Sequence, residues 1–320
     1  MDPRHLIQLA AILEHGSISQ ASRHLHLTQP TLTHNMQVLE VQSGGRLFER
    51  SRFGVRSTPL GDMLAREGRA IARRLQEAVE VTARQRSGLR STVRLGTGPL
   101  VGAALLPGLA HELLRAQPSI HLTLQSDRPN VLVDQLVDGR HDLVVAPSWL
   151  DRPPRGIERF LLVEDDLGVF CGRAHRLAAG GVLTGGAAKG QPWLSLGTTS
   201  PFDQDVREML EEAGVKTPRV EITVLGEAFM LLSTLARGAH LAVLPRFPMR
   251  LLLPHFPLVE LSLAARPKQR NIHLWCRATL LEDPSFVAIK DAILQYAQHV
   301  RGAMSLEHPS GRRSSRGRVA

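Results

Sequence analysis

Cysteines and long apolar runs are scarce in this 320-residue chain, and each of these two features excludes a class of protein. Two cysteines do not make a disulfide framework in a chain of this length. Cys171 and Cys276 lie in apolar, strand-like stretches, so we expect buried structural thiols rather than a redox pair. No stretch approaches the roughly 18 apolar residues of a spanning helix, and no apolar run follows a basic start at the N-terminus. We therefore expect a soluble, cytoplasmic protein that does not contact a membrane.

Catalytic and metal-binding motifs are scarce too. The sequence has no His/Cys cluster with metal-ligand spacing, no G-x-S-x-G elbow and no P-loop. One stretch, GTGPLVG from Gly96 to Gly102, is similar to the glycine-rich loop of dinucleotide-binding domains, and Asp127 follows the next predicted strand. Pro99 removes a backbone N–H that a pyrophosphate would need. We expect no enzyme, cofactor or metal, and the alternative is an NAD(P)-dependent oxidoreductase that uses Gly96–Gly102.

Charge is unevenly distributed along the chain. Residues 1–90 carry 13 Lys/Arg against 8 Asp/Glu, residues 91–300 carry 21 against 21, and residues 301–320 carry 5 against 1. A basic N-terminus joined to a neutral main part is typical of a nucleic-acid-binding module attached to a domain that binds no polyanion. Residues 301–320 are rich in Ser, Gly and Arg without periodicity, so we expect a disordered basic tail.

The stretch Ile18–Glu40 predicts two short amphipathic helices joined by a turn at His26-Leu27. Apolar residues recur at helical spacing in both halves, and Thr28 and Pro30 suit the start of the second helix. The exposed face of that second helix then carries short or medium, mostly uncharged polar side chains: Gln29, Thr31, Thr33, His34 and Gln37. Such a face suits base edges in a major groove. An ordinary helical hairpin with a solvated face is the alternative.

The segments on either side favour DNA binding. Pro3–His15 has one apolar stripe and predicts a third helix that closes the core. After the pair, Arg46–Gly61 predicts a hairpin-like wing in which Arg50, Arg52 and Arg56 surround the turn residue Gly54 and present positive charge to phosphates.

These motifs together resemble the LysR-type transcriptional regulators. The similarity is collinear through GSISQASRHLHLTQPTLTHNMQVLE, RLFER and STPLG. It implies that Thr28–Glu40 is a recognition helix, with Gln29, Pro30 and Thr33 near bases and Arg50 and Arg52 on the DNA backbone. His34 stands where arginine is frequent in the family. The resemblance further implies a regulator of an inverted-repeat operator in double-stranded DNA, with RNA polymerase as a further candidate partner.

A long helix should follow the wing. Thr58-Pro59 has the pattern of a helix start, and the helix should continue to about Gln85, a length of roughly 40 Å. Apolar or small residues at coiled-coil-like spacing define a seam for which we expect a homodimer: Leu64, Gly68, Ile71, Leu75, Ala78 and Thr82. Packing on the N-terminal domain of the same chain is the alternative. The family resemblance also implies tetramers.

The remaining chain predicts an α/β effector domain. From residue 91 to about 300, apolar strands alternate with helices, which indicates parallel sheet covered on both faces. We expect two Rossmann-like subdomains, one of about 91–162 and 266–300 and the other of about 163–265. GRHDLVV and ARGAHLAVLP are similar to the family's effector domain, itself similar to type 2 periplasmic binding proteins. The expected order is a winged helix-turn-helix (1–58), a linker helix and hinge (59–90) and this domain.

A small-molecule effector should bind where strands end, near helix N-termini that attract anions. After the predicted strands and before the following helices come nine candidates: Thr97, Gly98, Pro99, Ser126, Ser148, Trp149, Gly197, Thr198 and Thr199. Their hydroxyls could bind a small anionic or polar ligand, on which Trp149 could stack. For each hydroxyl, a helix cap or turn is the alternative role. Phe202 falls where many relatives carry an arginine, so the family's ligand chemistry does not transfer directly.

Overall fold

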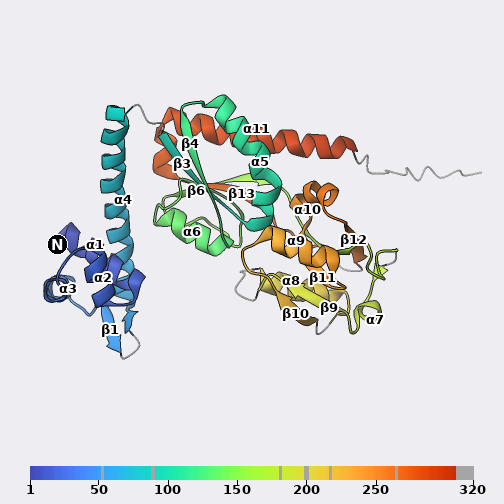
Figure 1. Cartoon of the computed structure of the whole chain (residues 1–320), viewed down its shortest axis with the longest axis horizontal. Coiled ribbons are helices and arrows are strands. Elements are labelled where there is room, and N and C mark those ends of the chain that lie inside the picture. Colours follow the sequence, from blue (N-terminus) through green and yellow to red (C-terminus); the bar gives the residue numbers. More distant parts are fainter. Residues whose placement is uncertain are drawn as a thin grey trace, which may run out of the picture. The chain divides into compact units, whose positions relative to one another are not determined.

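The computed structural model of the chain describes residues 1–51, 54–87, 91–179, 182–197, 202–215, 218–263 and 266–307. These residues fall into two compact units. One is Met1–Ser91 with Val137–Arg140, and the other holds the remaining residues from Thr92 onward. Figure 1 labels the helices and strands of both units.

Three short helices form the core of the first unit: α1 (Pro3–His15), α2 (Ile18–His24) and α3 (Gln29–Ser43). The Asp2 carboxylate caps α1 by accepting from Arg4 N, and the Thr28 hydroxyl caps α3 by accepting from Thr31 N. The apolar residues at helical spacing meet in one core, with almost no exposure of Leu9, Ile12, Leu32, Met36 and Leu39. The three predicted helices are confirmed.

The turn and the wing are held by specific backbone geometry. His26, at the predicted turn between α2 and α3, has a φ of 54°, in the left-handed region. Strands β1 (Phe48–Ser51) and β2 (Gly54–Ser57) pair antiparallel as the predicted wing. Val55 N donates to Gly16 O at 2.9 Å, and a Cβ on Gly54 would lie 2.6 Å from the same oxygen. The wing therefore contacts the α1–α2 turn so closely that only glycine fits at position 54.

Helix α4 (Pro59–Ser87) packs along α1 over its first half. A Cβ on Gly68 would lie 2.0 Å from Leu6 O, so the two helix backbones touch there. Leu64 and Ile71 pack against the core of their own unit. Both residues therefore have packing partners within their own chain and stay only partly exposed, and their place in a dimer seam stays a prediction. Further along α4, Ala78 is exposed and Leu75 is 58% exposed.

Two mixed sheets organise the second unit. The first has the order β4-β3-β5-β13-β6, formed by β3 (Ser91–Thr97), β4 (Ile120–Ser126), β5 (Leu143–Pro147), β6 (Ile157–Val163) and β13 (Ile272–Arg277). The second has the order β10-β9-β11-β7-β12-β8, formed by β7 (Leu167–Gly172), β8 (Val182–Leu183), β9 (Pro192–Ser195), β10 (Arg219–Thr223), β11 (Leu241–Pro245) and β12 (Leu258–Leu263).

The sheets are not wholly parallel as predicted. Within the first, β3 and β5 are parallel while β13 runs antiparallel to β5 and β6. Within the second, β9 pairs parallel with β10 and β11, while β7 runs antiparallel to β11 and β12. The antiparallel pairs arise where the chain crosses from one sheet to the other and returns, since the crossing strands do not run through a βαβ connection.

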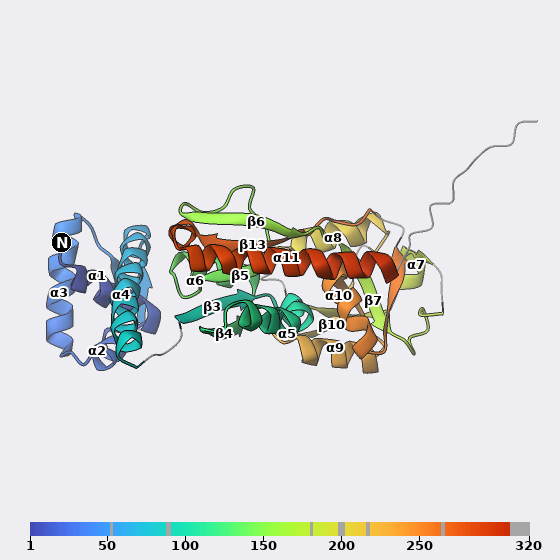
Figure 2. The same ribbon diagram turned by 90° about the horizontal axis from the view of Figure 1, so that it is seen from above.

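Helices cover the sheets. On the first sheet, α5 (Pro99–Ala116) and α11 (Pro284–Glu307) lie side by side on one face and α6 (Pro129–Val137) lies on the other (Figure 1; Figure 2). The second sheet carries α8 (Asp203–Glu212), α9 (Ala228–Arg237), α10 (Arg246–Leu252) and the short α7 (Gly185–Ala188). Short 3-10 helices span Leu253–His255 and Ala278–Glu282.

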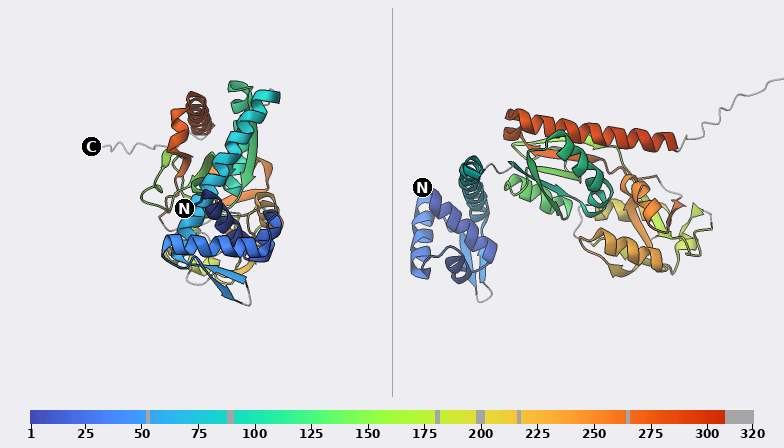
Figure 3. Two further views of the ribbon diagram at one scale, coloured as in Figure 1. Left: turned by 90° about the vertical axis from the view of Figure 1, so that its left-hand side faces the viewer. Right: turned by 45° about the horizontal axis from the view of Figure 1, so that its top comes forward.

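Helix α11 extends further than predicted. The expected disordered tail began at residue 301, but the helix continues to Glu307, as the red helix in Figure 3 shows. Val300 and Met304 pack against the core of the first sheet, which gives these turns a buried face. Residues 308–320 of the predicted tail lie outside the described part of the chain.

The predicted burial of both thiols is confirmed. Cys171 lies in β7 and Cys276 in β13, in different sheets, and both are free and fully buried. Burial raises the pKa of each thiol to about 11, so neither is a reactive thiolate at neutral pH. Among the described helices, none combines the length and the apolar character needed to cross a bilayer.

Candidate nucleic-acid interface and effector site

Helix α3 has one buried and one exposed face. Leu32, Met36 and Leu39 point into the core, while Gln29, Pro30, Thr31, His34 and Gln37 are exposed and Thr33 is partly so. The exposed side therefore carries the predicted polar set, with hydroxyl and amide groups that can both donate and accept.

Hydrogen bonds fix the position of α3. The Asn35 side chain donates to the Gln8 amide oxygen on α1 at 2.9 Å, and the Ser19 hydroxyl of α2 donates to the Gln29 amide oxygen at 3.2 Å. At its C-terminal end, the Glu40 carboxylate accepts from Leu47 N at 2.9 Å, which ties α3 to the wing. The recognition face and the wing are thus held in one rigid frame.

The arginines of the wing are only partly described. Arg50 belongs to β1, but its side chain lies outside the described part, as does the whole of Arg52. Arg56 is exposed on β2, opposite Glu49. The predicted phosphate contacts of Arg50 and Arg52 therefore remain predictions.

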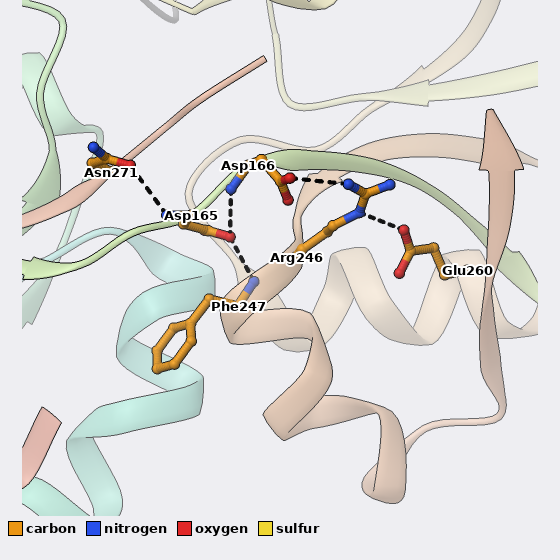
Figure 4. A network of polar contacts seen from close by, with 6 residues as sticks. All are labelled: Asp165, Asp166, Arg246, Phe247, Glu260 and Asn271. Atoms are coloured by element: carbon orange, nitrogen blue, oxygen red, sulfur yellow. Dashed lines mark hydrogen bonds and ion pairs between the residues drawn. The ribbon is translucent and has the colours of Figure 1, made fainter. Parts of the chain in front are cut away.

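The two sheets of the second unit are linked by two chain crossings, of which the structure describes residues 164–166 and 266–271. The crossings bind each other, because Arg270 N donates to Asp165 O at 2.7 Å and Leu167 N donates to Lys268 O at 3.1 Å. Asp165 Oδ1 also accepts from Asp166 N and from Phe247 N at the start of α10, and Asn271 Oδ1 accepts from Asp165 N (Figure 4).

Arg246 forms two ion pairs at the same crossing. Its guanidinium binds the Asp166 carboxylate at 3.1 Å and the Glu260 carboxylate at 2.5 Å, from two different strands or loops (Figure 4). The Asp165 carboxylate is buried and its Oδ2 has no hydrogen-bond partner among the described residues. Burial therefore raises the pKa of Asp165 to about 6, although its two backbone hydrogen bonds act in the opposite direction.

The predicted effector residues do not form one site. Gly98 and Pro99 line a cavity of only about 60 Å³ between the two sheets, together with Pro147, Asp165 and Arg270. That volume accommodates a few waters at most. The strand ends converge there as predicted, but they nearly close the space.

Most of the predicted hydroxyl groups either form hydrogen bonds within the chain or do not line the cavities. Thr97 is 1% exposed, its hydroxyl donates to Gly98 O at 3.3 Å, and it is not among the residues that line the cavity at Gly98, so its ligand contact stays a prediction. Ser126 is exposed and lines neither this cavity nor the larger one described below. The Ser148 hydroxyl accepts from Arg159 at 2.5 Å and from Leu150 N, which makes it a loop residue. Thr198 and Thr199 lie outside the described residues.

A larger cavity lies beside the first. It has a volume of about 450 Å³ and is lined by α8, β9 and β10, with Gly197 among the predicted residues. Its walls are mainly apolar and include Trp193, Leu194, Leu196, Val206, Leu210, Val215, Val220 and Val243. Leu196 and Arg270 line both cavities, so these two side chains form the partition between them.

Aromatic side chains and Arg270 meet at this partition. The Arg270 guanidinium lies 4.0 Å from the centroid of the Phe202 ring, and Phe202 contacts Trp149 edge to face at 6.3 Å between centroids. Trp149, predicted to stack on a ligand, instead lies between Phe202 and Trp275. Arg270 was not among the predicted site residues, and its only signal in the sequence is a charge two residues before an apolar strand.

Two of the three glycines of the dinucleotide-like loop, Gly96 and Gly102, have packing roles, whereas a Cβ on Gly98 would meet open space. A Cβ on Gly96 would lie 2.8 Å from Leu132 Cδ2, and a Cβ on Gly102 would lie 2.6 Å from Thr97 Cγ2. Both glycines therefore allow a strand and a helix to pack closely, and no bound phosphate is needed to explain them.

Comparison with known families identifies the two units. Residues 3–62 match the model described as "Bacterial regulatory helix-turn-helix protein, lysR family", and residues 86–298 match "LysR substrate binding domain". The chain therefore belongs to the LysR family. It is a DNA-binding transcriptional regulator with a helix-turn-helix domain and an effector-binding domain modulated by a small molecule, which confirms the resemblance seen in the sequence.

Individual relatives agree with this membership. The chain is 26% identical over 224 residues to the HTH-type transcriptional regulator GbpR of Rhizobium radiobacter, covering 67% of this chain and 72% of GbpR. It matches the structure of full-length CbnR complexed with its target DNA at a TM-score of 0.58 and 20% identity, covering 94% and 100% of the two chains. It also matches the effector binding domain of QuiR in complex with shikimate at 0.54 and 18%, covering 66% and 98%. These two structures establish likeness of fold.

The buried Asp165 carboxylate makes stability depend on pH. Its pKa is about 6 in the folded chain and near 3.8 when exposed, so between these values the folded state holds a proton that the unfolded state lacks. This contribution raises the free energy of unfolding as pH falls from about 6 toward about 4. Asp165→Asn keeps an acceptor oxygen but cannot titrate, and should lose that component. Denaturant unfolding followed by tryptophan fluorescence measures it.

The exposed Asp151 provides the matched control. Asp151→Asn should keep the pH dependence of the wild type between about pH 4.5 and 7, whereas the difference between Asp165→Asn and wild type should grow toward neutral pH in favour of the variant. Parallel pH profiles for Asp165→Asn and wild type would contradict a buried, titrating Asp165.

Proposed function

We propose that this chain reads an inverted-repeat operator as a homodimer, through the exposed face of α3 in each subunit. The observation that carries the proposal is the exposed polar row of α3, held rigidly against α1, α2 and the wing. A two-fold protein presents two such helices, so its operator should contain two half-sites related by symmetry. The solved complex of CbnR with its target DNA supports DNA binding by a chain of this fold.

Within α3 we assign base contacts to Gln29, Pro30 and Thr33, with Thr31, His34 and Gln37 beside them. Gln29 and Thr33 lie in the N-terminal half of the helix, the part that a helix-turn-helix protein directs at base edges. The wing arginines Arg50, Arg52 and Arg56 are assigned to phosphates, where they add affinity without sequence preference.

Replacing a base-contacting side chain should relax operator choice. Gln29→Ala and Thr33→Ala should each weaken operator binding by about 1–3 kcal/mol and weaken nonspecific DNA binding much less. Gln42→Ala, on an exposed position near the other end of the same helix, is the matched control and should bind the operator like wild type. Fluorescence anisotropy with operator and scrambled duplexes measures both affinities. A loss shared equally by both duplexes, or by Gln42→Ala, contradicts the assignment.

The dimer contact is proposed for the second half of α4. Leu64 and Ile71 are engaged by their own unit, whereas Leu75 and Ala78 remain exposed one turn apart on the predicted stripe. An exposed leucine on a long helix has apolar area to bury against a second copy. Association of dimers into tetramers and contact with RNA polymerase are further proposals that rest on the family resemblance.

A charge at the proposed seam should separate the subunits. Leu75→Arg places two arginines face to face in a dimer, so it should shift the protein toward monomer, because burial of unpaired charge is costly. Met63→Arg is the matched control, since Met63 is 55% exposed on the same helix but off the stripe. Light scattering gives the mass and circular dichroism the helix content. A dimer that survives Leu75→Arg, or dissociates equally with Met63→Arg, places the contact elsewhere.

The second unit is proposed to act as a sensor and not as an enzyme. Packing explains Gly96 and Gly102 of the loop Gly96–Gly102, which weakens the main support for an oxidoreductase. The complex of the QuiR effector domain with shikimate supports binding of a small molecule by this fold. A regulator of this kind would act in the cytoplasm, in contact with the chromosome. Its ligand would change operator binding through different affinities for two arrangements of the protein.

A further inference from the structure

The larger cavity has the size and lining of a small-molecule site. Its volume of about 450 Å³ lies within the range of about 300–1,000 Å³ typical of ligand pockets. Its apolar walls come from α8, β9, β10 and Val243 of β11, whereas the predicted cleft between the sheets holds only about 60 Å³. An apolar ligand body therefore fits beside the second sheet and not between the strand ends.

Arg270 places a positive charge in this cavity. Its Nε is buried and has no hydrogen-bond partner among the described residues. Asp165 and Asp205 act on it electrostatically, but among the described residues no ion pair within 4.0 Å joins it to a carboxylate. Asp165 Oδ1 is held instead by the backbone N–H groups of Asp166 and Phe247. Burial lowers the pKa of Arg270 to about 10, which still leaves the guanidinium charged at neutral pH.

Phe202 contacts the guanidinium of Arg270. The Arg270 Cζ atom lies 4.0 Å from the centroid of the Phe202 ring, and the N–H groups of a guanidinium lie in its own plane. In that plane it can form the paired hydrogen bonds that carboxylate, sulfonate and phosphate oxygens accept. Phe202 thus orients the arginine, and the ligand supplies the missing acceptor.

The other charges around the cavity limit the ligand to one anionic group. Arg207 also lines it, but it is paired with Asp203. Glu211 is exposed at the wall and adds a negative charge, which would repel a second anionic group on the ligand. Arg270 is therefore the one cation among the described lining residues without an ion-pair partner.

We infer that the cavity between α8, β9 and β10 binds an apolar small molecule with a single anionic group, which pairs with Arg270. This inference deepens the proposed function, on which it rests, because it names the chemical class of the effector. Arg270 belongs to a crossing segment, and its backbone binds Asp165 of the other crossing. A ligand held by its side chain is therefore attached directly to the connection between the two sheets.

A matched pair of probes tests the charge requirement. By calorimetry with the full chain and no DNA, 1-naphthoate should bind wild type at least about tenfold more tightly than the neutral 1-naphthamide. Arg270→Gln should remove that preference and leave naphthamide binding unchanged, and Arg266→Gln, an exposed arginine of the same segment, should behave like wild type. Val206→Trp fills the cavity and should abolish binding of both probes.

Several outcomes overturn the inference. The first is that wild type binds the two probes with equal affinity. The second is that Arg270→Gln weakens binding of both probes equally. The third is that Val206→Trp binds the probes as tightly as wild type. If Arg270→Gln does not fold, Arg270→Lys carries the test, with a several-fold loss for naphthoate alone because an ammonium lacks the planar fork. A charge-dependent site without any effect on operator binding would support this inference and contradict the proposed regulation. If operator binding responds to other metabolites while neither probe binds, the proposed regulation is supported and this inference is contradicted.

Discussion

The shorter of two backbone hydrogen bonds at the crossings that link the sheets of the effector domain runs from Arg270 N to Asp165 O. The rest of the domain's chemistry depends on where this bond places its two residues. It fixes the Asp165 carboxylate at the start of α10, where the carboxylate accepts from Phe247 N (Figure 4). It also directs the Arg270 side chain toward Phe202 and the partition between the cavities. A buried carboxylate and a partly buried guanidinium at one hinge are costly to desolvate, and such groups gather at functional sites.

Local sequence signals predicted the N-terminal unit well. The apolar spacing of α1 to α3, the cap at Thr28 and the glycine turn of the wing all act within a few residues, so their pattern is visible in one sequence. The seam on α4 was less predictable. Its apolar stripe shows that the helix has a partner, but not that Leu64 and Ile71 find theirs on their own chain while Leu75 stays exposed.

The strand directions and the cavities of the second unit depend on long-range contacts and could not be predicted from the sequence. The strands of β5 and β11 are short, fully buried apolar runs and were predicted, whereas the half-exposed β6 and β12 have no comparable signal. Both sheets are mixed because β7 and β13, the strands that follow the two crossings, run antiparallel to their neighbours. The effector cavity shows the same limit, because Arg270 and Phe202 meet only through the crossing. Strand-end rules placed Gly98 and Pro99 at the cleft but could not show that the cleft is nearly closed.

We propose above all that the exposed α3 face and the basic wing bind DNA in a two-fold arrangement. The most direct measurement is a nuclease footprint, combined with a salt titration of affinity, on the DNA beside the chain's own gene. We expect protection of an inverted repeat and an affinity that falls linearly on a log–log plot, by a slope of about −0.9 for each phosphate neutralised. Absence of a protected inverted repeat, or binding that does not weaken with salt, would contradict it.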